Sequence, residues 1–184
     1  MEQKMRVNKI NLFDLIVADV NRYRTIFRLT GSYGITIVFQ PRFIAVLLIR
    51  LARSFHVVGI PIIPRIISII LFIFFGIEYG LQCDIGPGLI LPHPQGIVIG
   101  ANCIGRNAII YHRVTLGAKK MDPIWNSNKR PFVGDDVLLG SGSVVLGPVK
   151  IGDRVQIGAN TVVFTNIADD MNVVGQPALI KERR

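Results

Sequence analysis

Cysteine is scarce in this sequence. Only Cys83 and Cys103 occur among 184 residues, and neither belongs to a Cys-x-x-Cys motif or to a His/Cys cluster at metal-ligand spacing. This scarcity argues against a disulfide framework and against a metal centre. We therefore expect two buried, reduced thiols and no bound metal.

The sequence also lacks a clear membrane span. Its most apolar stretch, residues 60–77, is shorter than the ~20 residues that cross a bilayer, and Pro61, Pro64 and Arg65 interrupt its first part. We expect a helix from about residue 65 to residue 75, buried against the rest of the protein or dipping into a membrane interface. Acidic residues interrupt the apolar N-terminal stretch and no small-residue cleavage site follows, so we predict no signal peptide and a cytoplasmic location.

Acidic residues are few in the first part of the chain. Residues 1–77 contain 10 Lys/Arg and 3 Asp/Glu, whereas residues 78–184 contain 11 and 9. A basic and apolar segment suits an anionic membrane surface, and no nucleic-acid-binding motif is present. We expect no nucleic-acid partner and hypothesise peripheral contact of the N-terminal helices with the inner face of the membrane. The alternative is a helix pair whose Arg stems lie along the protein surface.

The first 77 residues have helical periodicity. Apolar residues recur at helical spacing within residues 10–29, and Gly31 and Gly34 end this amphipathic helix. A second helix is expected from Pro41 to about His56, because proline is tolerated at the first helical position. We therefore assign residues 1–77 to an N-terminal α-helical region.

From residue 78 onward the sequence follows a six-residue period. Aliphatic side chains occupy every sixth position in one unbroken phase, at Val133, Leu139, Val145, Ile151, Ile157 and Val163. An earlier array contains Ile104, Ile110 and Leu116, and its phase slips around Cys103. This period indicates a parallel β-helix, in which three hexads complete a coil of about 18 residues and the aliphatic side chains form a continuous core. The predicted fold is therefore mainly β, with the β-helix spanning residues 78–184.

Residues 118–132 have no hexad character. We expect them to leave the coil as an extruded loop that contains Trp125. Long loops in compact scaffolds are more often functional than not.

Several stretches resemble a known family. They are FFGIEYGLQCDIGPGLILPHPQGIVIG, HRVTLGA, VGDDVLLGSGSVVLGPVKIGDRVQIGANTVV and VVGQPALI. They are similar to the serine acetyltransferase branch of the hexapeptide-repeat acyltransferases, closest to the enzymes that O-acetylate capsular, colanic-acid-type and other exopolysaccharides. The resemblance implies a left-handed coil, acetyl-CoA as co-substrate, and a homotrimer or dimer of trimers with active sites between neighbouring β-helices.

The same resemblance assigns the catalytic residues. His93, between two prolines, matches the family's general base, and Glu78 matches its acidic partner. Acetyl transfer to a hydroxyl needs such a base, and a carboxylate can fix its tautomer and stabilise the imidazolium. Their spacing puts Glu78 and His93 on adjacent coils, whereas the competing Asp84 would lie across the coil. The alternative is that His93 only packs between the two prolines and has no catalytic role.

Acetyl-CoA would lie along small residues that let its pantetheine arm approach the backbone. By the resemblance these are Gly117, Ala118, Gly140, Ser141, Gly158 and Ala159. The turns of the six-residue repeat also favour small residues at these positions, so a purely structural role is the alternative. Candidates for binding the CoA phosphates are Lys150, Arg154, Lys181, Arg183 and Arg184.

The acceptor residues depart from the serine acetyltransferase pattern. Pro92 stands where those enzymes have an aspartate, and Arg130 where they have a histidine that contacts serine. A proline cannot bind the serine ammonium group and an arginine would repel it, whereas Arg130, His112 and Trp125 suit a sugar.

We therefore predict an acetyl-CoA-dependent O-acetyltransferase that acts on a capsular or exopolysaccharide sugar or its lipid-linked precursor. One alternative is a serine O-acetyltransferase of cysteine biosynthesis. A second, non-enzymatic alternative is a trimeric β-helical scaffold.

Overall fold

The computed structural model describes residues 11–28 and 36–175. The predicted helix end at Gly31 and Gly34 lies outside these residues, as do Lys181, Arg183 and Arg184. The described residues form three α-helices, α2 (Leu12–Ile26), α3 (Pro41–Val57) and α4 (Ile62–Phe75), with a short 3-10 helix, η2 (Thr36–Phe39), before α3. Helix α4 ends at Gly76, whose φ of 61° is a left-handed conformation that glycine adopts without strain.

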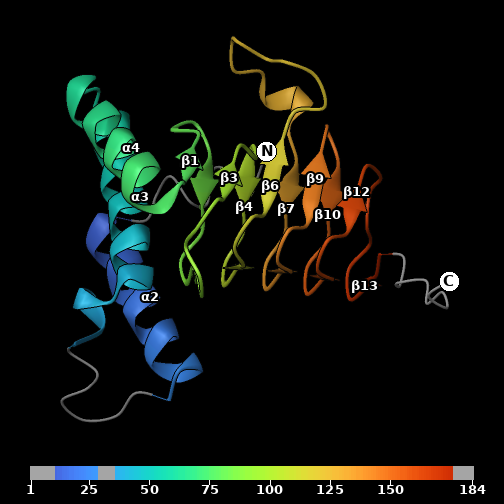
Figure 1. The fold of residues 1–184 in the computed structure, drawn as a ribbon, viewed down its shortest axis with the longest axis horizontal. Coiled ribbons are helices and arrows are strands. Elements are labelled where there is room, and N and C mark those ends of the chain that lie inside the picture. Colours follow the sequence, from blue (N-terminus) through green and yellow to red (C-terminus); the bar gives the residue numbers. More distant parts are fainter. Residues whose placement is uncertain (1–10, 29–35, 176–184) are drawn as a thin grey trace, which may run out of the picture.

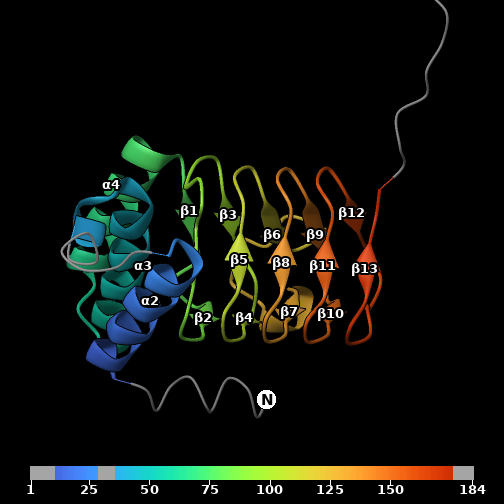
Figure 2. The ribbon, with the colours of Figure 1, turned by 90° about the horizontal axis from the view of Figure 1, so that it is seen from below.

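The rest of the chain winds into three parallel sheets (Figures 1 and 2). Sheet A contains β1 (Glu78–Tyr79), β3 (Val98–Ile99), β6 (Thr115–Gly117), β9 (Val144–Leu146) and β12 (Val162–Val163). Sheet B contains β2 (Asp84–Ile85), β4 (Cys103–Ile104), β7 (Phe132–Val133) and β10 (Lys150–Ile151). Sheet C contains β5 (Ile109–Ile110), β8 (Leu138–Leu139), β11 (Gln156–Ile157) and β13 (Asn172–Val173). N-terminal helices followed by stacked parallel strands agree with the predicted architecture.

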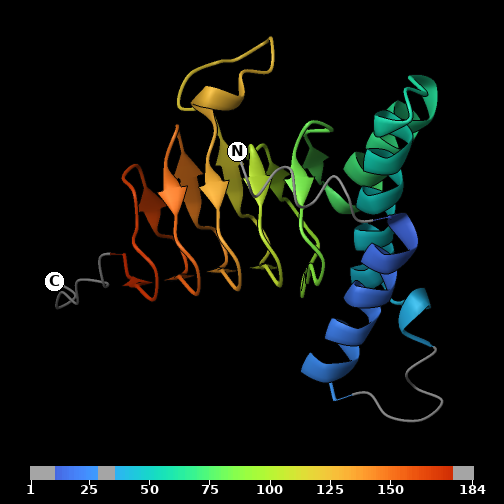
Figure 3. The ribbon, with the colours of Figure 1, turned by 180° about the vertical axis from the view of Figure 1, so that it is seen from behind.

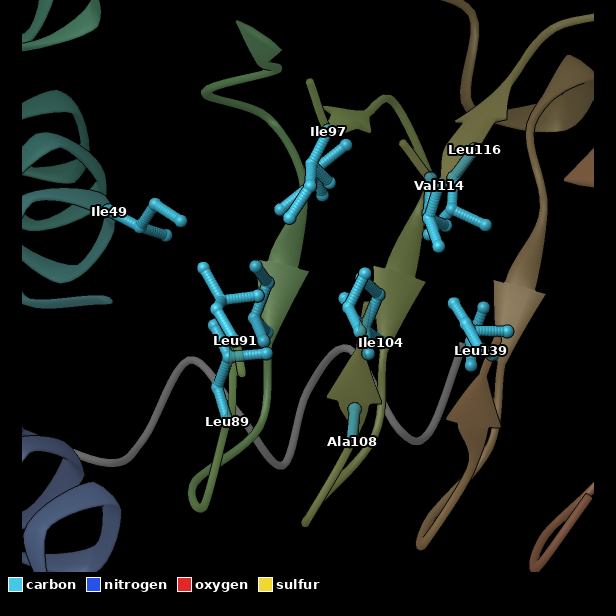
Figure 4. Close-up of a cluster of buried hydrophobic side chains, with 14 of the residues drawn as sticks. Ile49, Leu89, Leu91, Ile97, Ile104, Ala108, Val114, Leu116 and Leu139 are labelled. Atoms are coloured by element: carbon cyan, nitrogen blue, oxygen red, sulfur yellow. The ribbon is translucent and has the colours of Figure 1, made fainter. Parts of the chain in front are cut away.

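The hexad residues form the core of the coil. All six aliphatic residues of the regular phase, from Val133 to Val163, are buried. Phe132 pairs with Lys150, 18 positions later, whereas Glu78 pairs with Val98, 20 positions later. The earlier coils therefore depart from the regular period. Figure 4 shows how Leu91, Ile104 and Leu139 of successive coils point into the same apolar column.

A buried polar network joins the helices to the first coil. Arg50 of α3 donates from Nε and Nη2 to the carboxylate of Asp19 of α2, at 2.8 and 3.0 Å. The same carboxylate accepts the backbone N–H groups of Gly88 and Leu89 at 2.8 and 2.9 Å, and Arg50 also donates to the Gly86 carbonyl at 2.7 Å. Since the Arg50 and Asp19 side chains are only 3% and 1% exposed, this buried network fixes the helices over the end of the coil. Figure 3 shows from behind how the helices lie at that end.

Helix α4 is less buried than expected. It buries Pro64, Ile67 and Leu71, while Ile66, Phe72 and several other apolar side chains are exposed. Its neighbour α3 covers only one side of it, and an almost wholly apolar helix has no polar face to present to solvent. Among residues 11–28 and 36–175, no helix combines the length and apolar character needed to cross a membrane.

We predict that the substitution Asp19→Ala destabilises the fold strongly. It leaves the Arg50 guanidinium buried without its carboxylate, which costs about 3–5 kcal/mol of unfolding free energy. Chemical denaturation at fixed protein concentration measures this loss. The control is Asp170→Asn, which breaks an exposed ion pair with Arg154 and should have a much smaller effect. Equal losses in the two variants would contradict a structural role for the buried network.

Candidate active site

The Pro-His-Pro segment turns the coil from sheet C toward sheet A. Ile90 makes a parallel bridge to Ile109 of sheet C, and β3 of sheet A begins at Val98. Pro94 is buried at this corner, whereas the His93 side chain is exposed. Because proline fixes φ and needs no hydrogen-bond partner for its nitrogen, the two prolines stiffen the backbone under the imidazole. This corner presents His93 to solvent, where a base can reach a substrate.

A second histidine lies against the first. The rings of His93 and His112 have centroids 5.7 Å apart in an edge-to-face arrangement, and the Tyr111 ring lies 6.3 Å from His93. The Nδ1 atom of His112 is buried and has no hydrogen-bond partner among the described residues. The structure thus brings the predicted base together with one predicted acceptor residue.

Glu78 lies on the strand that pairs with β3, close in register to this corner. It is exposed on β1, and its Cα partner in β3 is Val98, five residues after His93. Within the described part of the chain, no hydrogen bond or ion pair joins Glu78 to His93. The competing Asp84 accepts a hydrogen bond from Arg53 Nε at 2.9 Å and is buried. Glu78 therefore stays the predicted partner, with contacts that would have to form when substrate binds.

Two of the three predicted CoA-binding pairs share the corner of His93. Gly140 follows β8 and Gly158 follows β11 in sheet C, and Gly142 N–H donates to the His112 carbonyl at 3.0 Å. A Cβ on Gly140 would lie 2.6 Å from the Ala159 nitrogen, so the coils approach too closely here for a side chain.

The other predicted CoA residues lie elsewhere. Gly117 and Ala118 are at the far end of sheet A, where the loop leaves the coil, and Lys150 is on sheet B. Arg154 donates to both carboxylate oxygens of Asp170 at 2.6 and 2.8 Å, which raises the pKa of its guanidinium further. Lys150 and Arg154 are therefore not gathered at the corner with Gly140 and Gly158, and their roles stay predictions.

The extruded loop leaves after β6 and returns at β7, with a short 3-10 helix, η3 (Ser127–Lys129), within it. The Arg130 guanidinium stacks on the Trp125 ring, 3.7 Å from its centroid. Arg130 also donates to the Gly100 carbonyl and to Asp122 Oδ2, both at 3.0 Å. These contacts fasten the loop to sheet A.

Asp122 changes the electrostatics of this cluster. Its carboxylate accepts the Asn126 N–H at 2.9 Å and pairs with Arg130, and these interactions lower the pKa of Asp122 below its ordinary value. The carboxylate therefore stays charged near neutral pH and offsets the charge of Arg130. The predicted repulsion between Arg130 and an ammonium group assumed a free guanidinium charge, whereas Asp122 pairs with it.

Two clusters of predicted acceptor residues thus lie at opposite ends of one strand. His93 and His112 come before β3 and β6, whereas Arg130 binds the carbonyl of Gly100, directly after β3. Within one chain, these clusters therefore do not share one pocket.

Three parallel sheets built from six-residue repeats are the architecture of a hexapeptide-repeat β-helix. The family model described as bacterial transferase hexapeptide (six repeats) matches residues 130–165.

Sequence relatives identify the family within this class. The serine acetyltransferase of Synechococcus elongatus is 31% identical over 173 residues, which cover 92% of this chain and 68% of the relative. The serine acetyltransferase of Helicobacter pylori is 36% identical over 143 residues, which cover 77% and 82%. The chain belongs to the serine acetyltransferase family. The prediction of an acetyl-CoA-dependent O-acetyltransferase is confirmed, and the scaffold alternative is set aside.

Solved structures agree with this assignment. The structure of Neisseria gonorrhoeae serine acetyltransferase has a TM-score of 0.79 and 25% identity, covering 94% of this chain and 65% of that one. The isoform 3 enzyme of Entamoeba histolytica, in complex with cysteine, has a TM-score of 0.78 and 29% identity, covering 94% and 61%. The chain thus spans a little under two thirds of the length of these two enzymes.

The prediction of a polysaccharide acceptor is wrong. The sequence and structural relatives named above are serine acetyltransferases, not the capsular or colanic-acid-type enzymes that the sequence motifs predicted. The error came from Pro92 and Arg130, two positions judged by their residue types alone.

Sequence reasoning missed three residues around these sites. Asp122 pairs with Arg130 across eight positions of an irregular loop, and no periodicity marks it. Tyr23 lay within the apolar pattern of the first helix, yet its hydroxyl reaches the Leu91 backbone. Arg42 lines a pocket beside His93, but in the sequence no pattern distinguishes it from the other basic residues of the first 77.

We predict that Gly80→Ala displaces the loop. A Cβ at residue 80 would lie 2.6 Å from Cη2 of Trp125, so the indole must move away from β1. Since Trp125 is the only tryptophan, its fluorescence emission should shift to the red. Gly117→Ala is the control, because its Cβ meets nothing closer than 3.8 Å. An unchanged emission maximum in Gly80→Ala would show that Trp125 is not packed there in solution.

Proposed function

We propose that the protein transfers the acetyl group of acetyl-CoA to the hydroxyl of L-serine. The relationship to serine acetyltransferases across 92% of the chain carries this proposal. The pairing of Arg130 with Asp122 supports it, because it removes the main electrostatic objection to an ammonium-bearing acceptor.

In this reaction His93 is the general base. Its imidazole takes the serine hydroxyl proton as the oxygen attacks the thioester carbonyl, and the tetrahedral intermediate then expels the CoA thiolate. The imidazolium returns its proton to the sulfur, so that O-acetylserine and CoA leave with all protons accounted for. A carboxylate beside the imidazolium stabilises it, and Glu78 is the candidate for that role. Backbone N–H groups along the corner are the candidates for stabilising the oxyanion.

We infer that the working site is shared between copies of the chain. The histidine cluster and the Arg130–Trp125 cluster lie at opposite ends of β3 in one chain. A neighbouring coil could bring its own loop cluster to the His93 corner, as a homotrimer would do. The left-handed sense of the coil is likewise inferred from the family to which the chain belongs.

The experiment follows thiol release from acetyl-CoA with L-serine and, separately, with a panel of sugars. We expect turnover with L-serine and none above background with the sugars. Mass spectrometry of the product should show one acetyl group added to serine. Absence of turnover with L-serine would overturn the proposal.

We predict that His93→Ala lowers kcat by about 10²–10⁴-fold, the usual contribution of a general base. The thermal unfolding midpoint should hardly change, because the side chain is exposed. His56→Ala is the matched control, since His56 lies near the end of α3, away from the corner, and should leave kcat unchanged. A His93→Ala enzyme with normal kcat would remove this residue from the mechanism.

A further inference from the structure

A pocket opens beside His93 on the side of the helices. Its volume is about 360 Å³, and it is lined by Pro41 and Arg42 of α3, Phe74 and Phe75 of α4, and residues 92–95 of the corner. The Phe75 carbonyl accepts the Gly96 N–H at 3.1 Å, so the end of α4 is fastened to the corner that carries the base. The pocket therefore has walls from both the helical region and the coil, and His93 is part of its lining.

Arg42 gives this pocket its charge. Among the described lining residues it is the one arginine, and the pocket contains no lysine or carboxylate. Its guanidinium carbon lies 4.7 Å from the centroid of the Phe27 ring, which supports the group in place. Within residues 11–28 and 36–175, no carboxylate forms an ion pair with Arg42. A guanidinium held at a pocket wall without an anion is suited to bind one from a ligand.

The backbone positions Arg42 relative to the base. The Tyr23 hydroxyl donates to the Arg42 carbonyl at 3.1 Å and accepts the Leu91 N–H at 3.0 Å. Tyr23 is fully buried, and burial raises the pKa of its hydroxyl well above the ordinary value, so it stays protonated and keeps this donor. One hydroxyl thus ties the start of α3 to the residue two places before His93.

We propose that Arg42 binds the carboxylate of the acceptor and thereby aims the acceptor hydroxyl at His93. This inference rests on the proposed function and deepens it. An arginine at this position would favour acceptors that carry a free carboxylate close to the hydroxyl group. A guanidinium can take both oxygens of a carboxylate, which fixes orientation as well as position. Pro92 offers no charge to an ammonium group, so recognition from the carboxylate end explains how the acceptor is held without an acidic residue at that position.

The test compares L-serine with L-serinamide, which keeps the hydroxyl and the amine but has no carboxylate. Arg42→Ala should raise the KM for L-serine on the order of 10- to 100-fold, the worth of a hydrogen-bonded charged contact. The KM values for L-serinamide and for acetyl-CoA should stay unchanged. Arg42→Lys should restore part of the loss, because it keeps the charge but not the planar fork. The matched control is Arg65→Ala, an exposed arginine of α4 outside the pocket.

An unchanged KM for L-serine in Arg42→Ala would overturn this inference while leaving the proposed function intact. An equal rise for L-serine and L-serinamide would overturn it too, because the loss would then not involve the carboxylate. Ligand-observed NMR reads binding without turnover: L-serine should bind the unaltered protein and not Arg42→Ala. If Arg42→Ala still binds L-serine, Arg42 does not hold the carboxylate. This binding result stands independently of turnover, so it separates failure of this inference from failure of the proposed function.

Discussion

The carboxylate of Asp19 is the most heavily bonded buried group between the helices and the first coil. It is buried, it pairs with Arg50, and it accepts two backbone N–H groups of the first coil. A buried charge of this kind is tolerated only where partners satisfy it, so α2, α3 and the coil must dock in one arrangement. The apolar column of the β-helix begins directly against this junction.

The site depends on that docking. The coil alone provides His93 and His112 at an exposed corner, but the pocket beside them has helical walls. Tyr23, four residues after Asp19 on the same helix, connects the start of α3 with Leu91 of the corner. The helices therefore form part of the pocket beside His93 as well as a cap on the apolar end of the coil.

The sequence predicted those features that follow from local periodicity. The hexad residues are buried as their period predicts. The helices appear with shifted bounds, because α2 ends at Ile26 rather than near residue 29 and α4 begins at Ile62 rather than near residue 65. The acceptor was predicted wrongly because the environment of Arg130 depends on Asp122, and contacts within an irregular loop have no period. The Tyr23 hydroxyl and the pocket at Arg42 were missed for a similar reason, since both arise where segments far apart in sequence meet.

The most direct test of the claim that the helices shape the acceptor site is steady-state kinetics of Tyr23→Phe. This change removes one hydroxyl from a buried ring and leaves its packing against Phe27 and Phe43 in place. The account predicts a higher KM for L-serine, an unchanged KM for acetyl-CoA, and a fold that remains intact by circular dichroism. An intact variant with the normal KM for L-serine would contradict it.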